Sequence, residues 1–131
     1  MIRTVILGSG RGTNARALLQ AQQNGELGLA EVVGIFSDQQ HAPILKLGPR
    51  FDVSAFYLNP GNYRTKLDGD AELHWIDMIR PLAPDLVVLA GFMRVVKQPF
   101  LQAFPRTLNL HPSLLPKYPG LDAIARALAA G

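Results

Sequence analysis

The stretch Val5-Ile6-Leu7-Gly8-Ser9-Gly10-Arg11-Gly12-Thr13-Asn14 decides the fold. Its β-branched, apolar start is typical of a buried strand, its three glycines form a tight turn, and residues 14–23 are rich in good helix formers. A strand, a turn and a helix in this order are the first unit of a parallel sheet covered by helices. The turn also presents backbone N–H groups at a helix N-terminus, where the helix dipole favours a phosphate.

The same turn limits the kind of ligand. A dinucleotide fingerprint requires a third glycine three places after Gly10, and that place holds Thr13, although Asp38 follows the second expected strand where a ribose-binding acid would stand. A mononucleotide-type phosphate site therefore fits better than NAD. Thr13 and Asn14 supply a hydroxyl and an amide that can cap the helix or hold a phosphate oxygen. An NAD-type domain and a capped turn without a ligand stay open as alternatives.

Short β-branched runs alternate with helix-compatible segments along the rest of the chain, which predicts an α/β fold: a Rossmann-like open parallel sheet with helices on both faces. We expect a helix stripe of Leu73, Ile76 and Ile79 with Trp75 half-buried beside it, and a short helix that Gly48-Pro49 breaks. The expected strands are residues 3–7, 32–36, 53–58, 86–90 and 107–110, and the expected helices are residues 14–23, 43–47, 71–80, 98–104 and 122–130.

Composition excludes several classes of function. The chain has 131 residues, 48% of them apolar and none of them cysteine, so we expect one domain over residues 1–131 without disulfides or thiolate metal sites, as in a reducing cytoplasm. Its net charge of +3 comes from scattered residues, which gives little support to nucleic-acid binding. No apolar run approaches the ~20 residues that span a bilayer, and the three histidines lack spaced acids, so we expect neither a membrane span nor a metal site.

Asn109 and His111 form the candidate catalytic pair. They lie two residues apart at the end of an expected strand, so their side chains project on the same side. An amide donor beside an imidazole that titrates near neutral pH suits an oxyanion that forms on a carbonyl under attack. A histidine that merely bonds a loop carbonyl is the alternative.

Three segments together resemble a known family. Asn109-Leu110-His111-Pro112-Ser113-Leu114-Leu115-Pro116 resembles the N-x-H-P-S-L-L-P signature of formyltransferases that use 10-formyltetrahydrofolate. Residues 9–14 resemble the S-G-x-G-[ST]-N phosphate loop of that family, and Ala90-Gly91-Phe92-Met93-Arg94 its A-G-F-M-R strand exit. In combination they resemble the phosphoribosylglycinamide formyltransferases of purine biosynthesis, which implies the N-terminal part of the formyltransferase fold.

The resemblance implies roles for individual residues. It assigns the phosphate of glycinamide ribonucleotide to Gly12, Thr13 and Asn14. It assigns the folate pterin to the backbone and apolar side chains of residues 93–96, with Asn109 and a basic residue nearby. The folate-binding residues that it implies are Met93, Arg94, Val95, Val96, Asn109 and Arg64. A solvated surface arginine without a ligand is the alternative for Arg64.

The mechanism that the resemblance implies places the amine of glycinamide ribonucleotide against the formyl carbon, with Asn109 and His111 stabilising the oxyanion. In the family, a carboxylate that pairs with this histidine lies in a later segment of the domain, which this sequence does not reach. We therefore expect a chain that lacks the C-terminal third of the family domain. Such a chain is either truncated or pairs with a second copy. Another formyltransferase that uses 10-formyltetrahydrofolate, and a nucleotide- or folate-binding module without catalysis, are the alternatives.

Overall fold

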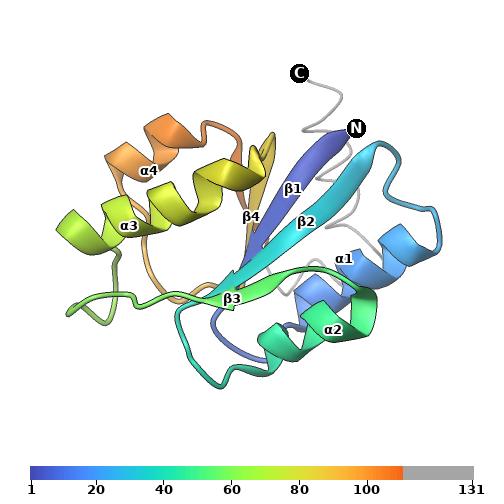
Figure 1. The fold of residues 1–131 in the computed structure, drawn as a ribbon, viewed down its shortest axis with the longest axis horizontal. Helices are drawn as coiled ribbons and strands as arrows, with labels where there is room; N and C mark the ends of the chain where they lie inside the picture. The colour runs from blue at the N-terminus through green and yellow to red at the C-terminus, as the bar shows by residue number, and fades with distance from the viewer. Residues whose placement is uncertain (111–131) are drawn as a thin grey trace.

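A computed structural model describes residues 1–110 and shows a sheet of five parallel strands in the order β3-β2-β1-β4-β5 (Figure 1). The strands are β1 (Ile2–Leu7), β2 (Ala30–Ser37), β3 (Ala55–Tyr57), β4 (Leu86–Ala90) and β5 (Thr107–Leu110). The helices are α1 (Thr13–Gln23), α2 (Leu47–Phe51), α3 (Gly69–Ile79) and α4 (Gln98–Ala103), with short 3₁₀ turns at η1 (Pro43–Lys46) and η2 (Arg80–Leu82).

The strand order reverses between β1 and β4. The chain runs outward from β1 through β2 to β3, returns through α3, and then extends the other side of the sheet with β4 and β5. Leu7, the last residue of β1, pairs with Phe36 of β2 and with Leu89 of β4, so the carboxyl ends of these three strands meet at one edge. Open α/β sheets bind their ligands at such a reversal. The predicted α/β fold with a parallel sheet is confirmed.

Helices cover both faces of the sheet, and each face has its own core (Figure 1). On one face Leu18 and Leu19 of α1 pack with Ile6 and Ile35 of the sheet. On the other face Trp75 and Ile79 of α3 pack with Val5 and Val87, and α4 adds Phe100. These side chains alternate along each strand because successive residues of a strand point to opposite faces.

The helix around Gly48-Pro49 differs from the prediction. The glycine and the proline do not break it; they lie at the second and third positions of α2, which continues from η1 as far as Phe51. A proline in the first turn of a helix removes an N–H that has no partner within the helix, so it costs little there. The predicted stop at this position was wrong for that reason.

The buried face of α3 also differs from the prediction. Leu73 is 53% exposed, whereas Trp75 is fully buried and donates from Nε1 to the carbonyl oxygen of Asn59 at 3.0 Å. A strict spacing of three residues drifts around a helix that has 3.6 residues per turn, so Leu73 and Ile79 cannot share a narrow face. The face that packs on the sheet runs through Glu72, Trp75, Ile76 and Ile79.

Strands β4 and β5 have the predicted bounds, and β3 is shorter than predicted. The helix expected over residues 122–130 lies outside the described residues. Within the described part, no helix has the length and apolar character needed to cross a membrane.

Candidate active site

The glycine turn (residues 8–12) leads from β1 into α1 and leaves the helix start without a side-chain cap. Gly12 is the N-cap residue, with a φ of 76°, and its carbonyl oxygen accepts the first helical hydrogen bond from the Arg16 N–H at 2.7 Å. The N–H groups of Thr13, Asn14 and Ala15 therefore have no partner within the helix. The first turn of α1 carries no acidic residue. A helix of this kind attracts an anion to its N-terminus.

Packing explains two of the three glycines in this turn. A Cβ on Gly8 would lie 2.4 Å from Ile44 Cδ1, and one on Gly12 would lie 2.8 Å from Ile44 Cγ1. A Cβ on Gly10, in contrast, would meet no heavy atom of the described residues within 4 Å. Packing therefore does not explain the glycine at position 10. The open space beside it leaves room for a ligand to approach the backbone.

Asn14 connects the helix start to the end of β5. Its side chain is buried, and Nδ2 donates to the carbonyl oxygen of Leu110 at 3.5 Å. The residue therefore does not cap α1, and instead it brings the phosphate-type turn next to the strand that carries Asn109. The two motifs that the sequence analysis singled out lie at the same edge of the sheet.

Asn109 is exposed and lies in register with Leu89 of β4. Leu110 packs into the core on the α1 face, so its neighbour Asn109 projects from the opposite face, which α3 and α4 cover. The glycine turn and Asn109 thus approach the carboxyl edge from the two faces of the sheet. His111 and the proline-rich loop up to Gly120 lie outside the described residues.

The segment that follows β4, here called the β4 exit segment (residues 91–97), is joined to the glycine turn. The Ser9 N–H donates to the Gly91 carbonyl oxygen at 3.2 Å, and the Met93 N–H donates to Ser9 Oγ at 2.9 Å. Met93 and Val95 are 74% and 65% exposed. An apolar surface on a well-tied backbone suits a flat, ring-shaped ligand.

Val95 and Arg94 use their polar groups within the protein. Val95 donates its N–H to Thr65 at 2.8 Å and accepts from the Leu67 N–H at 3.0 Å, so its backbone is already paired. The Arg94 Nε donates to Asp38 Oδ2 at 2.7 Å, and both side chains are buried. The Asp38 carboxylate is thus buried and paired through Oδ2, which argues against the NAD-type alternative, where it would face a ribose.

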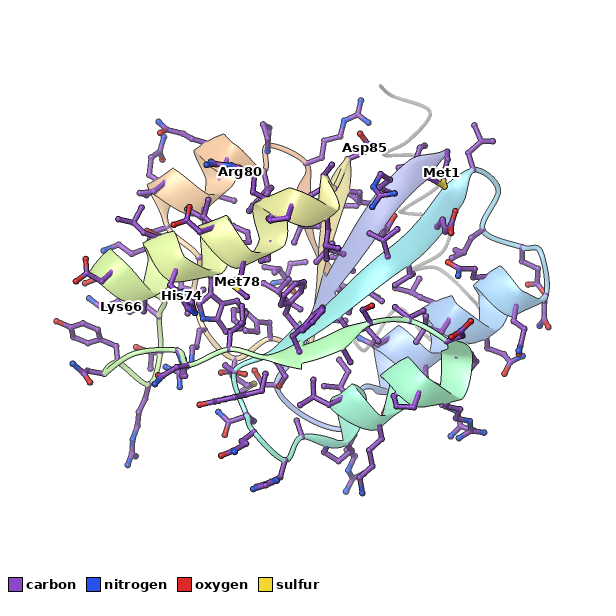
Figure 2. The ribbon with its side chains drawn as sticks, in the orientation of Figure 1. Met1, Lys66, His74, Met78, Arg80 and Asp85 are labelled. Carbon is purple, nitrogen blue, oxygen red and sulfur yellow. The ribbon has the colours of Figure 1, made fainter. Side chains whose placement is uncertain are left out.

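The loop before α3 carries the remaining predicted residue. Arg64 is exposed there, close in sequence to Lys66, whose Nζ lies 4.5 Å from the centre of the Tyr63 ring. Figure 2 shows Lys66 at the end of α3 that adjoins this loop. Basic side chains thus lie beside the β4 exit segment, because Lys66 pairs with Val95 in a parallel bridge.

Another ion pair flanks the β4 exit segment at the surface. The Lys97 ammonium group donates to the Asp68 carboxylate, and this hydrogen bond lowers the pKa of Asp68 and raises the pKa of Lys97. Both groups are exposed to solvent, so the pair contributes little to stability.

Sequence reasoning missed the polar residues that tie these loops together. Ser9 links the glycine turn to Met93, Asp38 holds Arg94, and the buried Glu72 accepts the Lys97 N–H through Oε2 at 2.8 Å. An acidic residue at a buried helix position, such as Glu72, was the one available signal. In the stretch that ends at Leu110, no group of three or more metal-ligating side chains comes together.

Comparison with known proteins identifies the family. The sequence profile described as formyl transferase matches residues 2–131. The chain belongs to the formyl transferase family. Its match covers the glycine turn, the β4 exit segment and the Asn109–His111 motif together.

Individual formyl transferases give the extent of the similarity. The phosphoribosylglycinamide formyltransferase of Escherichia coli (strain K12) is 39% identical over 129 residues, which are 97% of this chain and 59% of that protein. The Haemophilus influenzae phosphoribosylglycinamide formyltransferase is 34% identical over 132 residues, which are 100% of this chain and 61% of that protein. The crystal structure of glycinamide ribonucleotide transformylase 1 from Symbiobacterium toebii has a TM-score of 0.77 and 39% identity, and covers 100% of this chain and 61% of that one. The chain therefore spans about three fifths of the length of these relatives.

Proposed function

We propose that this chain carries the substrate sites of a phosphoribosylglycinamide formyltransferase. The reaction would move a formyl group from 10-formyltetrahydrofolate to the amine of glycinamide ribonucleotide in purine biosynthesis. The observation that carries the proposal is the pairing of two unlike loops at the strand reversal, joined through Ser9. One loop suits an anion and the other suits an apolar ring.

The phosphate of glycinamide ribonucleotide would bind at Gly12, Thr13 and Asn14. The uncapped N–H groups at the start of α1, the absence of an acid in its first turn and the open space beside Gly10 support this placement. The Thr13 hydroxyl, which belongs to an exposed residue, would add a further donor.

The folate would lie on residues 93–96. The exposed side chains of Met93 and Val95 support an apolar contact with the pterin ring. Because the Val95 backbone is paired and the Arg94 side chain is bonded to Asp38, the hydrogen bonds to the ring would come from the backbone of Arg94 and Val96. Arg64, on its exposed loop, would attract the acidic end of the folate.

The chemistry would use Asn109 and His111. The amine of glycinamide attacks the formyl carbon and forms a C–N bond, and the formyl oxygen takes the negative charge. Asn109 would donate a hydrogen bond to this oxygen, and His111 as imidazolium would stabilise the charge. Collapse of the intermediate breaks the bond to N10 of the folate, which receives a proton from His111, while the new amide loses its extra proton to solvent.

Formyl transfer by the His111→Ala variant tests the proposal. One preorganised donor of this kind is worth about 3 kcal/mol of barrier, so we expect a loss on the order of a hundredfold or more in rate with glycinamide ribonucleotide and 10-formyltetrahydrofolate. His74→Ala is the matched control, because His74 is exposed on α3 and should leave the rate unchanged (Figure 2). A near-normal rate in His111→Ala would contradict the mechanism.

A binding module without catalysis is the second candidate function. It is supported by the kind of groups that the two loops offer, which are uncapped backbone N–H groups at the start of α1 and exposed apolar side chains at Met93 and Val95. Such groups bind a ligand without taking part in a reaction. Tight binding of both substrates by the unaltered chain, with no formyl transfer, would select this candidate. Binding of a folate but not of glycinamide ribonucleotide would instead point to another formyltransferase of the same family.

A further inference from the structure

The β4 exit segment is held by bonds to four separate parts of the molecule. Each of these four parts is bonded to a different residue of the segment. The bonds are Met93 to Ser9, Arg94 to Asp38, Val95 to Thr65 and Leu67, and Lys97 to Glu72. Backbone groups of the segment make four of these five bonds, and the buried side chain of Arg94 makes the fifth. A further side-chain bond of the segment, from Lys97 to Asp68, lies at the surface.

The Arg94–Asp38 bond is a buried ion pair. The Arg94 side chain is 9% exposed and that of Asp38 is 1% exposed, and one bond of 2.7 Å joins Nε to Oδ2. Asp38 Oδ1 and Arg94 Nη1 are also buried and have no hydrogen-bond partner within the described part of the chain. Two charges removed from water in this way rarely improve stability over an apolar pair of the same size. Stability is therefore a weak reason for this pair, and a fixed geometry is the better one.

The Arg94–Asp38 ion pair fixes the orientation of the apolar surface that Met93 and Val95 expose. Asp38 follows β2, which lies two strands from β4 in the sheet, so the pair spans β1 and fastens the segment to the far side of the strand reversal. Met93 and Val95 flank Arg94 in sequence and carry the exposed side chains. An arginine anchored between them sets the direction in which both side chains project.

We propose that Asp38 is a positioning residue for the folate. Through Arg94 it holds the β4 exit segment so that Met93 and Val95 present one apolar surface to the ring. The identity of the ligand rests on the proposed function, whereas the fastening of the segment does not. The acid after β2 thus orients a neighbouring loop, and its carboxylate does not contact the ligand.

Asp38→Asn tests this proposal, because it keeps the shape of the side chain and removes its charge. We expect faster hydrogen exchange at the Met93 and Val95 amides, and about tenfold weaker binding of the stable reduced folate 5-formyltetrahydrofolate, as small displacements of a binding group have effects of at least this size. The affinity for glycinamide ribonucleotide should not change. Asp68→Asn is the matched control: it breaks the exposed pair with Lys97 on the same segment and should change neither measurement.

The outcomes separate the two proposals. Unchanged exchange at Met93 and Val95 together with unchanged folate affinity would overturn the positioning role, as would an equal loss of affinity for both ligands with faster exchange throughout β1. Should the unaltered chain bind no folate, the proposed function fails. Hydrogen exchange at the Met93 and Val95 amides of Asp38→Asn then still tests whether Asp38 holds the β4 exit segment in place. Should Asp38→Asn fail to fold, the double variant Asp38→Asn with Arg94→Met removes both charges and is expected to show the same local loosening.

Discussion

The glycine turn and the β4 exit segment are neighbours at one edge of the sheet, but they offer a ligand different kinds of contact. The glycine turn offers backbone N–H groups and an open approach at Gly10. The β4 exit segment has its backbone tied to its neighbours and offers exposed apolar side chains. The two strand-to-helix connections of one sheet are therefore specialised in different ways. The first leaves backbone N–H groups unpaired within its helix, and the second pairs the backbone of Met93 and Val95 while exposing their apolar side chains.

Gly12→Ala should give the largest effect on stability. The new Cβ would lie 2.8 Å from Ile44 Cγ1 at a φ of 76°, so both overlap and backbone strain oppose it. We expect the free energy of unfolding to fall by about 2–4 kcal/mol in urea titrations.

Gly10→Ala is the matched control for Gly12→Ala, because its Cβ meets open space. We expect stability within about 0.5 kcal/mol of the unaltered chain and weaker binding of glycinamide ribonucleotide. Equal destabilisation by the two substitutions would show that packing alone explains the glycines.

Met93→Ala sharpens the description of the β4 exit segment. Met93 is 74% exposed, so the loss of its side chain should leave the unfolding free energy unchanged. If it covers the pterin, removing its buried contact should weaken 5-formyltetrahydrofolate binding by roughly tenfold in a fluorescence titration. Met78→Ala on α3 serves as the control, since Met78 lies on the side of α3 that faces β3 and lines a hollow with Phe56 (Figure 2). Normal folate affinity in Met93→Ala would remove the apolar surface from the site.

Ser9→Ala breaks the bond that joins the two regions. Without the hydroxyl, the Met93 N–H loses its acceptor at 2.9 Å, so we expect the free energy of unfolding to fall by about 1 kcal/mol. Ser54→Ala is the comparison, because Ser54 is exposed and immediately precedes β3, at the amino end of that strand. No difference between the two variants would mean that the regions are not coupled through Ser9.

Asp68→Asn should have the smallest effect, and one that depends on pH. The pKa of Asp68 is lowered by the Lys97 ammonium group, so its contribution is present above the ordinary carboxyl pKa of 3.8 and is lost as the pH falls through the lowered value. The pKa of Lys97 is raised, so its contribution is present below 10.5 and is lost as the pH rises through the raised value. The difference in melting temperature from the unaltered chain should therefore vanish in strong acid and in high salt. A difference that persists in acid would contradict this origin.

The strands were predicted well because a buried parallel strand is a local pattern. Leu86–Ala90 has no polar alternation, and its bounds match the prediction. The buried face of α3 was predicted poorly because the contacts of its buried residues are distant in sequence: Trp75 packs with Val5 and Val87 of the sheet, and Glu72 accepts a hydrogen bond from Lys97. Local spacing does not contain those contacts.

The candidate site divides in the same way. The glycine turn and the A-G-F-M-R exit are local motifs, so the sequence is enough to recognise them, and their roles as ligand loops stay predictions. The Asp38–Arg94 pair joins residues 56 positions apart, so only the folded chain brings it together. The sequence shows that Asp38 stands where a ribose-binding acid would stand in an NAD-type domain, but its position after a strand does not reveal that the carboxylate is bonded to Arg94.

The most direct test of the account is an NMR titration that follows backbone amides with each substrate in turn. We expect glycinamide ribonucleotide to shift the amides of Gly10, Thr13 and Asn14, and 5-formyltetrahydrofolate to shift those of residues 93–96. If neither ligand shifts these amides, or if both shift the same set, the assignment of the two loops to two substrates is wrong.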